Sequence, residues 1–515
     1  MLKYILGDIL WKKNIKKYLK IFVLILIIPC IFLLSACNFG SSEKTIRSIE
    51  KTSSTGLVDT YTIYYTDNST YTFNITNGKN GQDAGKITIE EVYNAVKEKG
   101  YTGSFDDFIK EYLNYEVEEN DETIGINKAI LSAVSVYSQF QTITDEPVYT
   151  ETIFGQVQTG TQKVKNTLVS AGSGIVYKLD KENGNAYVIT NYHVIYNKDS
   201  IDKIGTSKVF LYGSKVNVYY ETDKNSNKVL DENGYPKVHY SEDAIECTYV
   251  GGSLNYDIAV LKVTNSNILK NSNAKQVEIA DSYRVGDSAI AIGNPEAEGI
   301  SVTKGIVSVE SEYIQMLGAD EKTAVEFRTI RIDTAINSGN SGGGLFNSYG
   351  KLIGVVNAKV VKDEIENIAY AIPRDIVVNV ANNLIYNFET NNTNKVYKLT
   401  VGLYLEIKES SAVYNLETQT TKIVEKVIVN QVVSNTLASK CAFKKNDIIK
   451  SITISHKISE TETETKTYEI DRMFNAIDLA LNIKIGDSVT YEVIRDNLTT
   501  PISFVATSEY FSFIE

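Results

Sequence analysis

Short apolar runs of strand length fill the middle of the chain, and they limit the possible folds more than any other feature. Between about residues 173 and 361, runs such as SGIVYKL, AYVITNYHVI, DIAVLKV and KLIGVVNAKVV follow one another, separated by Gly and Asn/Asp turns. Almost no long helical period lies between them. Closely spaced strands without intervening helices are typical of a sandwich or barrel. The pattern predicts an all-β domain that ends near Pro373.

The chain has 515 residues, enough for two to four domains. A helical pattern over 124–140 leads into the strands, and a short helix is expected over 374–388. We therefore assign 124–388 to one β domain. The Asn-rich stretch 391–394 is interpreted as a linker, and 396–511, which mixes strands with a few helical turns, as a separate domain.

The first 36 residues have the composition of an export signal. Five lysines between positions 12 and 20 precede an apolar run over 21–34, and small residues follow. The run is short for a membrane-spanning helix. LSAC, which ends at Cys37, resembles the lipobox of bacterial lipoproteins, in which the cysteine is acylated. We expect 1–36 to be a lipoprotein signal peptide, Cys37 to carry lipid and the chain to be anchored at the outer face of the cytoplasmic membrane; an uncleaved anchor is the alternative.

The residues that follow the signal are expected to form a spacer and then a small module. The segment 37–55 is polar and is interpreted as flexible. Alternation over 60–76 around a DNS turn predicts a hairpin. Capping-box spacings at Thr88 and Ser104 predict two short helices. We interpret 56–115 as a small α+β spacer or docking module without chemistry of its own, with a glycan-binding or adhesin module as the alternative.

Charge and cysteine content exclude several classes of partner. The net charge of −12 gives no basic surface for nucleic acid. Cys247 and Cys441 lie far apart in different expected domains, so a disulfide between them is not expected. There are no CxxC or HxxxH spacings, so we expect no metal and no cofactor.

Two side chains of the β domain stand out as a possible base and its orienting acid. The chain has three histidines. His456 lies beyond the linker and His239 lies in a polar stretch that we interpret as an exposed loop, whereas His193 ends an apolar strand. Asp257 begins another apolar strand, where a buried carboxylate needs a partner. An imidazole bonded to that carboxylate would keep its other nitrogen free to accept a proton from serine.

The stretch NSGNSGGG over 337–344 supplies the possible nucleophile. A serine that attacks a carbonyl needs a base and two converging backbone N–H groups, and these require a tight, glycine-rich turn. Ser341 fits this need, with Gly339 and Ser341 as the N–H donors. Ser338 is interpreted as a turn residue.

The order His193, Asp257, Ser341 and the surrounding motifs resemble the HtrA/Deg family of chymotrypsin-fold serine proteases. The resemblance rests on SAGSGIVY, TNYHVI, YDIAVLKV, AIGNP, GIVS, DTAINSGNSGGGLFN and AYAIP, and it covers roughly 127–384. It implies a catalytic triad of His193, Asp257 and Ser341, and two six-stranded β-barrels with the triad at their junction. Relatives assemble as trimers or larger cages, which implies that the chain could be a homo-oligomer.

The C-terminal region is similar to the PDZ domain that follows HtrA-type protease domains. The similarity lies in SNTLASKCAFKKNDIIKSI and NIKIGDSVTYEVIRDN. PDZ domains bind an extended peptide C-terminus by strand addition. The resemblance places the peptide-binding loop at Leu405, Glu406 and Ile407, where the acidic side chain departs from the family's usual Leu-Gly-Ile. The expected fold class is thus mainly β, with a double β-barrel, a PDZ-like domain and a small N-terminal α+β module.

The leading hypothesis is a membrane-anchored extracytoplasmic serine endopeptidase that acts on misfolded or exposed polypeptides. By the resemblance, Ala335 would lie at the base of the specificity pocket, which favours a small or aliphatic residue before the cut bond. The long spacing between His193 and Asp257 predicts an elongated surface hairpin. The alternative function is a chaperone or binding module with a protease fold and no catalytic turnover.

Overall fold

The computed structural model describes residues 46–55, 58–65, 68–76, 97, 122–153, 155–358, 368–416, 419–459 and 462–514. The chain divides into two compact units, 1–118 and 119–515, each considered by itself. The expected signal peptide, Cys37 and the two helices predicted from Thr88 and Ser104 lie outside the described residues. No helix within the described ranges is both long and apolar enough to cross a membrane.

The described part of the first unit is a three-stranded antiparallel sheet. Its strands are β1 (Ile46–Thr55), β2 (Val58–Tyr65) and β3 (Thr70–Thr76), in that order across the sheet. The hairpin predicted over 60–76 is confirmed by the pairing of β2 with β3. The prediction of a flexible spacer over 37–55 was wrong for residues 46–55, which form β1 and pair with β2. Thr52 Oγ1 lies 2.9 Å from Thr62 Oγ1.

The second unit begins with a short helix and a seven-stranded antiparallel sheet. Strand order across the sheet is β10-β7-β4-β5-β6-β12-β11, and β8 pairs with β9 outside it. The bounds of these elements are α4 (Glu122–Ile130), β4 (Ala133–Thr152), β5 (Gly155–Asp180), β6 (Asn185–Thr190), α5 (Tyr192–Ile195), β7 (Thr206–Leu211), β8 (Val218–Tyr220), β9 (Val238–Tyr240), β10 (Ile245–Glu246), β11 (Thr248–Ser253), β12 (Ile258–Val263) and α6 (Asn267–Lys270).

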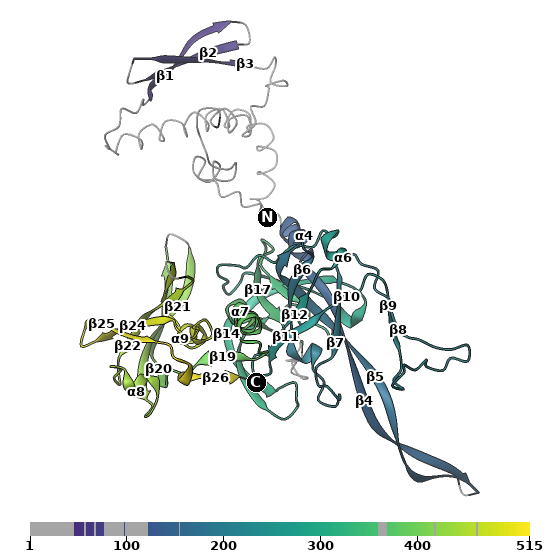
Figure 1. The fold of residues 1–515 in the computed structure, drawn as a ribbon. Coiled ribbons are helices and arrows are strands. Elements are labelled where there is room, and N and C mark those ends of the chain that lie inside the picture. The colour runs from purple at the N-terminus through teal and green to yellow at the C-terminus, as the bar shows by residue number, and fades with distance from the viewer. Residues whose placement is uncertain are drawn as a thin grey trace, which may run out of the picture. The chain divides into compact units, whose positions relative to one another are not determined.

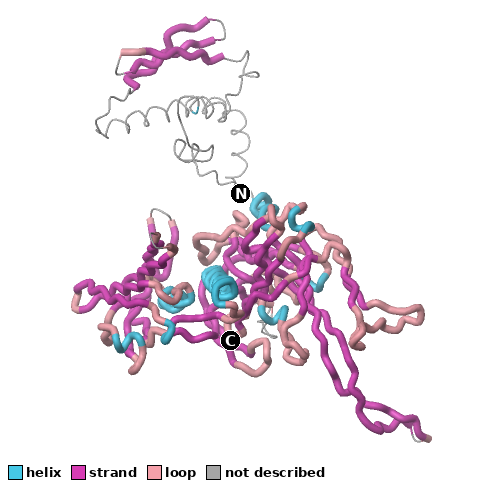
Figure 2. The backbone as a smooth tube through the Cα atoms, viewed as in Figure 1, coloured by secondary structure: helices cyan, strands magenta, loops and turns pink. Residues whose placement is uncertain are grey.

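Two expectations about this first half of the β domain need correction. The helical pattern predicted over 124–140 holds only to Ile130, because the β-branched and aromatic residues after it, such as Val134 and Tyr137, belong to β4. The expected six-stranded barrel is a seven-stranded sheet whose end strand β11 comes back into contact with β7. Beyond the sheet, β4 and β5 continue as a long two-stranded arm (Figures 1 and 2).

The next half is a closed six-stranded antiparallel barrel, as expected. Its hydrogen-bonded order is β13-β14-β15-β18-β17-β16. The elements are β13 (Ser288–Gly293), η3 (Pro295–Ala297), β14 (Ser301–Leu317), β15 (Ala324–Ile332), β16 (Gly344–Phe346), β17 (Leu352–Val356), β18 (Ala369–Pro373) and the closing helix α7 (Arg374–Asn391). A single apolar cluster joins residues of the sheet, such as Ile175 and Ile189, to barrel residues such as Ile290 and Phe346. The shared core fixes the two halves against each other.

A further β region follows α7. It consists of β19 (Val396–Leu399), β20 (Leu403–Asn415), β21 (Thr420–Val432), α8 (Leu437–Lys440), β22 (Ile448–Lys457), β23 (Thr463–Glu469), α9 (Met473–Asp478), η4 (Leu479–Leu481), β24 (Ser488–Arg495), β25 (Leu498–Val505), η5 (Ser508–Tyr510) and β26 (Phe511–Ile514). It has its own apolar core. The predicted linker packs against the seven-stranded sheet. The N–H of Gly252 in β11 donates to Asn394 O at 3.4 Å, and Val396, just after the linker, is fully buried.

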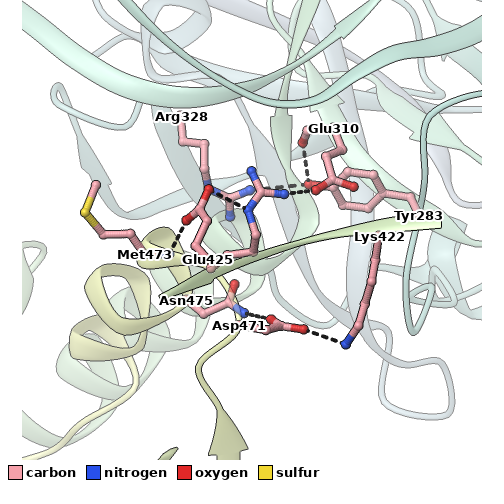
Figure 3. Close-up of polar contacts among 9 residues, drawn as sticks. Tyr283, Glu310, Arg328, Lys422, Glu425, Asp471, Met473 and Asn475 are labelled. Atoms are coloured by element: carbon pink, nitrogen blue, oxygen red, sulfur yellow. Dashed lines mark hydrogen bonds and ion pairs between the residues drawn. The ribbon is translucent and has the colours of Figure 1, made fainter. Parts of the chain in front are cut away.

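Ion pairs centred on two arginines join this domain to the barrel. Arg328 of β15 is 1% exposed, and its Nε and Nη2 lie 3.0 and 2.8 Å from Asp478 Oδ2 of α9. Its Nη2 also bonds Asp375 of α7. Arg472, just before α9, donates hydrogen bonds to Glu310 of β14 and Glu425 of β21. Figure 3 shows the two glutamates.

The ring of Phe474 lies within 4.0 Å of the Arg328 guanidinium carbon and 4.8 Å of that of Arg472. Burial raises the pKa of Asp478 to about 6, and Arg328 beside it offsets only part of that rise. At this contact between the barrel and the C-terminal domain, which we call the seam, the ion pair with Arg328 does not fully offset the cost of burying the Asp478 carboxylate.

Candidate active site

His193 lies on the one-turn helix α5, directly after β6. Its ring is held at both nitrogens: Nδ1 lies 2.6 Å from Asp257 Oδ2, and Nε2 lies 2.9 Å from Ser341 Oγ. The histidine side chain is 20% exposed and that of Asp257 only 8%. The sequence therefore brings three residues from distant positions into one line of hydrogen bonds.

Asp257 is fixed through both its backbone and its carboxylate. It immediately precedes β12 and adopts a left-handed backbone with φ of 50°, which Asp tolerates better than most residues. Its carbonyl accepts hydrogen bonds from Tyr192 N at 3.1 Å and from Asn191 Nδ2 at 2.8 Å. Its Oδ1 accepts the backbone N–H of His193 at 2.9 Å. The carboxylate thus accepts from the histidine at two places, which sets the plane of the ring.

These contacts favour one tautomer of His193. A carboxylate only accepts hydrogen bonds, so Nδ1 carries the proton that faces Asp257. Nε2 is then left as an acceptor for the Ser341 hydroxyl. Ser341 Oγ also accepts the N–H of Ala358 at 3.2 Å. The arrangement can take a proton from Ser341 as its oxygen attacks.

The peptides around Ser341 are held in fixed orientations. The carbonyl of Ser338 accepts from Glu296 N at 2.8 Å, and that of Gly339 accepts from Ser173 Oγ at 2.7 Å. The carbonyl of Asn340 accepts from Gly343 N at 2.9 Å, and that of Ser341 accepts from Ser173 N at 2.8 Å. Within the described ranges, the N–H groups of Gly339 and Ser341 donate to no acceptor. The two N–H groups that were predicted to bind an oxyanion are therefore free of other acceptors in the described residues.

Two glycines in this loop occupy places that a side chain could not. Gly339 has φ of 94°, and a Cβ there would lie 2.3 Å from Asn294 O. Gly342 has φ of 84°, and a Cβ there would lie 2.2 Å from Ser173 O. The glycines are therefore required by close backbone contacts with β5 and with the loop after β13.

Asn357, which the sequence analysis missed, supports the same carboxylate. It directly follows the strand β17, is 1% exposed, and its Nδ2 donates to Asp257 Oδ2 at 2.9 Å. The signal in the sequence was a single polar residue at the end of the apolar run LIGVVN. Asn357 therefore positions Asp257 rather than touching the reacting atoms.

Replacing Asn357 by Ala is expected to lower kcat of a peptidase at this site by roughly tenfold, with KM little changed. The change removes one hydrogen bond to a charged group, worth about 1.5–3 kcal/mol, and the histidine contacts of Asp257 remain. Steady-state kinetics on a peptide substrate would measure this. Asn379, buried in α7, offers a matched Asn→Ala control away from the site. Equal losses in both variants would contradict a positioning role.

The structure places the other nominated residues outside this site. His239 lies in β9 with its ring 4.7 Å from that of Tyr219, so it belongs to a short strand and not to a loop. This pair of strands is the hairpin predicted between His193 and Asp257. His456 contacts Asp487 in the C-terminal domain at 2.6 Å. Cys247 and Cys441 are free thiols, and burial raises the pKa of Cys247 to about 12.

Two expectations drawn from the resemblance concern residues outside the triad. Ala335 is exposed among the described residues and its carbonyl accepts from Thr303 Oγ1 at 2.8 Å, and its place in a specificity pocket stays a prediction. Leu405, Glu406 and Ile407 lie within strand β20 and not in a loop. The segment just before β20 contains Gly402, which has φ of 87° and lies against Thr436.

Comparisons with known proteins point in one direction. Residues 172–355 match the family model of the trypsin-like peptidase domain. The chain is 28% identical over 338 residues to the serine protease Do-like HtrA of Bacillus subtilis, covering 64% of this chain and 62% of the relative. It is 29% identical over 344 residues to the serine protease HtrA-like protein of Staphylococcus aureus strain MRSA252, covering 65% and 37%. The chain thus spans less than two thirds of the length of either relative.

Solved structures were also found, at low similarity. The HtrA-type protease AlgW with decapeptide has a TM-score of 0.40 and 19% identity, over 76% of this chain and 99% of that one. The serine endoprotease from Yersinia pestis has a TM-score of 0.36 and 18% identity, over 76% and 98%.

The match over residues 172–355, which span most of the first sheet and most of the barrel, indicates a trypsin-like peptidase domain in this part of the chain. The curated relatives to which the chain is similar are HtrA-type serine proteases.

Proposed function

We propose that the chain is a serine endopeptidase in which Ser341 is the nucleophile, His193 the general base and Asp257 the group that orients His193. The observation that carries the proposal is the continuous line Asp257 Oδ2–His193 Nδ1 and His193 Nε2–Ser341 Oγ, at 2.6 and 2.9 Å. Both distances lie within hydrogen-bond reach, as transfer of the serine proton requires.

The proposed reaction proceeds through an acyl-enzyme. Ser341 Oγ attacks the peptide carbonyl carbon while His193 Nε2 takes the hydroxyl proton. The carbonyl oxygen becomes an oxyanion that accepts hydrogen bonds from the N–H groups of Gly339 and Ser341. When the C–N bond breaks, the leaving amine takes the proton from His193. Water then attacks the ester with His193 again as base, which releases the acid and restores Ser341.

The C-terminal domain is proposed to bind an extended peptide. In the described part of the chain, β20 pairs only with β21, so one edge of β20 is open for strand addition, and α9 lies in contact with β20. Glu406 is exposed on that strand and would oppose a peptide carboxylate. Titration of the full chain with labelled C-terminal peptides, followed by fluorescence anisotropy, tests this. No saturable binding to any hydrophobic C-terminus would refute it.

The location and biological role are proposed from the sequence. An acylated Cys37 would anchor the chain outside the cytoplasmic membrane, where it would degrade misfolded or exposed proteins, and it could assemble as a trimer. Metabolic labelling with a fatty acid tests the anchor, because a Cys37→Ser chain should lose the label. A Cys37→Ser chain that labels as strongly as the wild type would end the lipoprotein proposal.

A serine-directed fluorophosphonate separates the peptidase from the alternative, a chaperone with a protease fold and no turnover. Wild-type chain should be labelled at Ser341, because an activated serine oxygen displaces fluoride from the probe and forms a phosphonate ester. Ser341→Ala should abolish labelling, whereas Ser338→Ala should retain it, since Ser338 is an exposed neighbour in the same loop. A wild-type chain that takes up no label with or without added peptide would favour the chaperone.

A further inference from the structure

Ser173 of β5 makes the contacts that hold the loop of the nucleophile in place. Its backbone N–H donates to Ser341 O at 2.8 Å, and its hydroxyl donates to Gly339 O at 2.7 Å. The same hydroxyl accepts the N–H of Asn294 at 2.7 Å. The side chain is 0% exposed. One buried serine thus joins the first sheet to two loops of the barrel.

The hydroxyl restrains Gly339 from both sides. On the C-terminal side it holds the carbonyl of Gly339 directly. On the N-terminal side it anchors Asn294, whose loop supplies the Glu296 N–H that binds the Ser338 carbonyl at 2.8 Å. In a trans peptide the C=O and N–H point in opposite directions, so fixing the Ser338 carbonyl fixes the direction of the Gly339 N–H.

Gly339 needs such external restraint because glycine has little conformational preference of its own. Its φ of 94° is one of several values that a glycine can adopt at low cost. A rotation about Gly339 would turn its N–H away from Ser341. Without the Ser173 hydroxyl, the buried Gly339 carbonyl and Asn294 N–H would both lose their partner, which favours such a rearrangement.

We propose that Ser173 is a positioning residue that keeps the Gly339 N–H aimed at the developing oxyanion. The proposal rests on the proposed peptidase function. It predicts that the Ser173 hydroxyl contributes to the rate of the chemical step and not to the binding of substrate or to the basicity of His193.

The test compares Ser173→Ala with Ser138→Ala in the full chain. Ser138 of β4 is also buried, and its hydroxyl bonds that of Ser207 at 2.9 Å, so the control removes a similar bond without touching the loop. Removing an oxyanion donor outright costs on the order of 10²–10³ in kcat. Because Ser173→Ala displaces a donor without deleting it, we expect kcat to fall by roughly 10- to 100-fold, with KM and the midpoint of the pH–rate profile unchanged.

Inhibition by a peptide aldehyde measures the stabilisation of the oxyanion separately from substrate binding. A peptide aldehyde forms a tetrahedral adduct with Ser341, whereas the matching peptide alcohol does not. Ser173→Ala should weaken inhibition by the aldehyde by about the same factor as kcat and leave the alcohol unaffected. If Ser173→Ala does not fold, Ser173→Cys, which keeps the size of the side chain but donates weakly, serves in its place.

The outcomes are distinct. Equal kinetics for Ser173→Ala and Ser138→Ala, or a rise in KM with kcat intact, would overturn the role of Ser173. Failure of the wild-type chain to react with the fluorophosphonate would refute the peptidase function itself.

Discussion

Replacing Asp257 by Asn is expected to lower kcat by about 10⁴-fold while KM stays nearly the same, a loss of about 5 kcal/mol of transition-state stabilisation. The Asp257 carboxylate accepts three hydrogen bonds, from His193 N, His193 Nδ1 and Asn357 Nδ2. An amide has one acceptor oxygen and would place an N–H donor where an acceptor is needed. His193 would then carry its proton on Nε2, which could no longer accept from Ser341.

Steady-state kinetics on a peptide substrate would measure the effect of Asp257→Asn. Asp199→Asn is the matched control, because the Asp199 side chain is largely exposed and pairs with Lys198, which is not part of the triad. The control should retain full activity. An Asp257→Asn chain that keeps more than about a tenth of the wild-type kcat would contradict the assignment of Asp257 as the group that orients His193.

Arg328→Ala is expected to destabilise the chain by about 3–5 kcal/mol, the usual cost of removing one partner from a buried ion pair. The guanidinium is 1% exposed and pairs with Asp478 of the C-terminal domain and with Asp375 of α7, the closing helix of the barrel. Removing it leaves Asp478 buried without its cation. Arg331→Ala on the same strand, whose pair with Glu312 is partly exposed, should cost less than about 1 kcal/mol.

The loss from Arg328→Ala should depend on pH. The pKa of Asp478 is raised by burial from 3.8 to about 6. A carboxyl with a raised folded-state pKa contributes its full stability below its unfolded pKa of about 4 and loses that contribution as pH rises through 6. Without Arg328 the folded pKa should rise further, so more stability is lost on going to high pH.

Urea unfolding followed by circular dichroism at pH 5 and pH 8 would show this. The gap between wild type and Arg328→Ala should widen at pH 8. A gap that is constant, or larger at pH 5, would contradict a buried, ionised Asp478 as the source of the effect.

The sequence was sufficient to locate the three chemical groups of the site. Each had a distinctive setting: His193 at the end of an apolar strand, Asp257 at the start of another, and Ser341 among glycines. The glycines were informative because Gly339 and Gly342 are needed for close backbone contacts, which no other residue permits. The β character of the main domain followed from closely spaced apolar runs.

The supporting residues were not predictable in the same way. Ser173 and Asn357 lie within apolar strands, and their role depends on which loop each strand faces in three dimensions. Arg328 sits at an inward position of β15 because its partners Asp478 and Asp375 lie on two later helices, far along the chain. Such long-range pairing leaves no local pattern. Leu405 was expected in a loop and lies in β20, since a motif match fixes a segment to within a few residues only.

The central claim is that Ser341 becomes acylated during turnover. The most direct measurement is a rapid-mixing experiment with an activated peptide ester, in which the acyl-enzyme is trapped with acid and mapped by peptide mass spectrometry. The account predicts a burst of about one leaving group per chain and an acyl group on Ser341. Turnover without a burst, or an acyl group on any other serine, including Ser338, would contradict it.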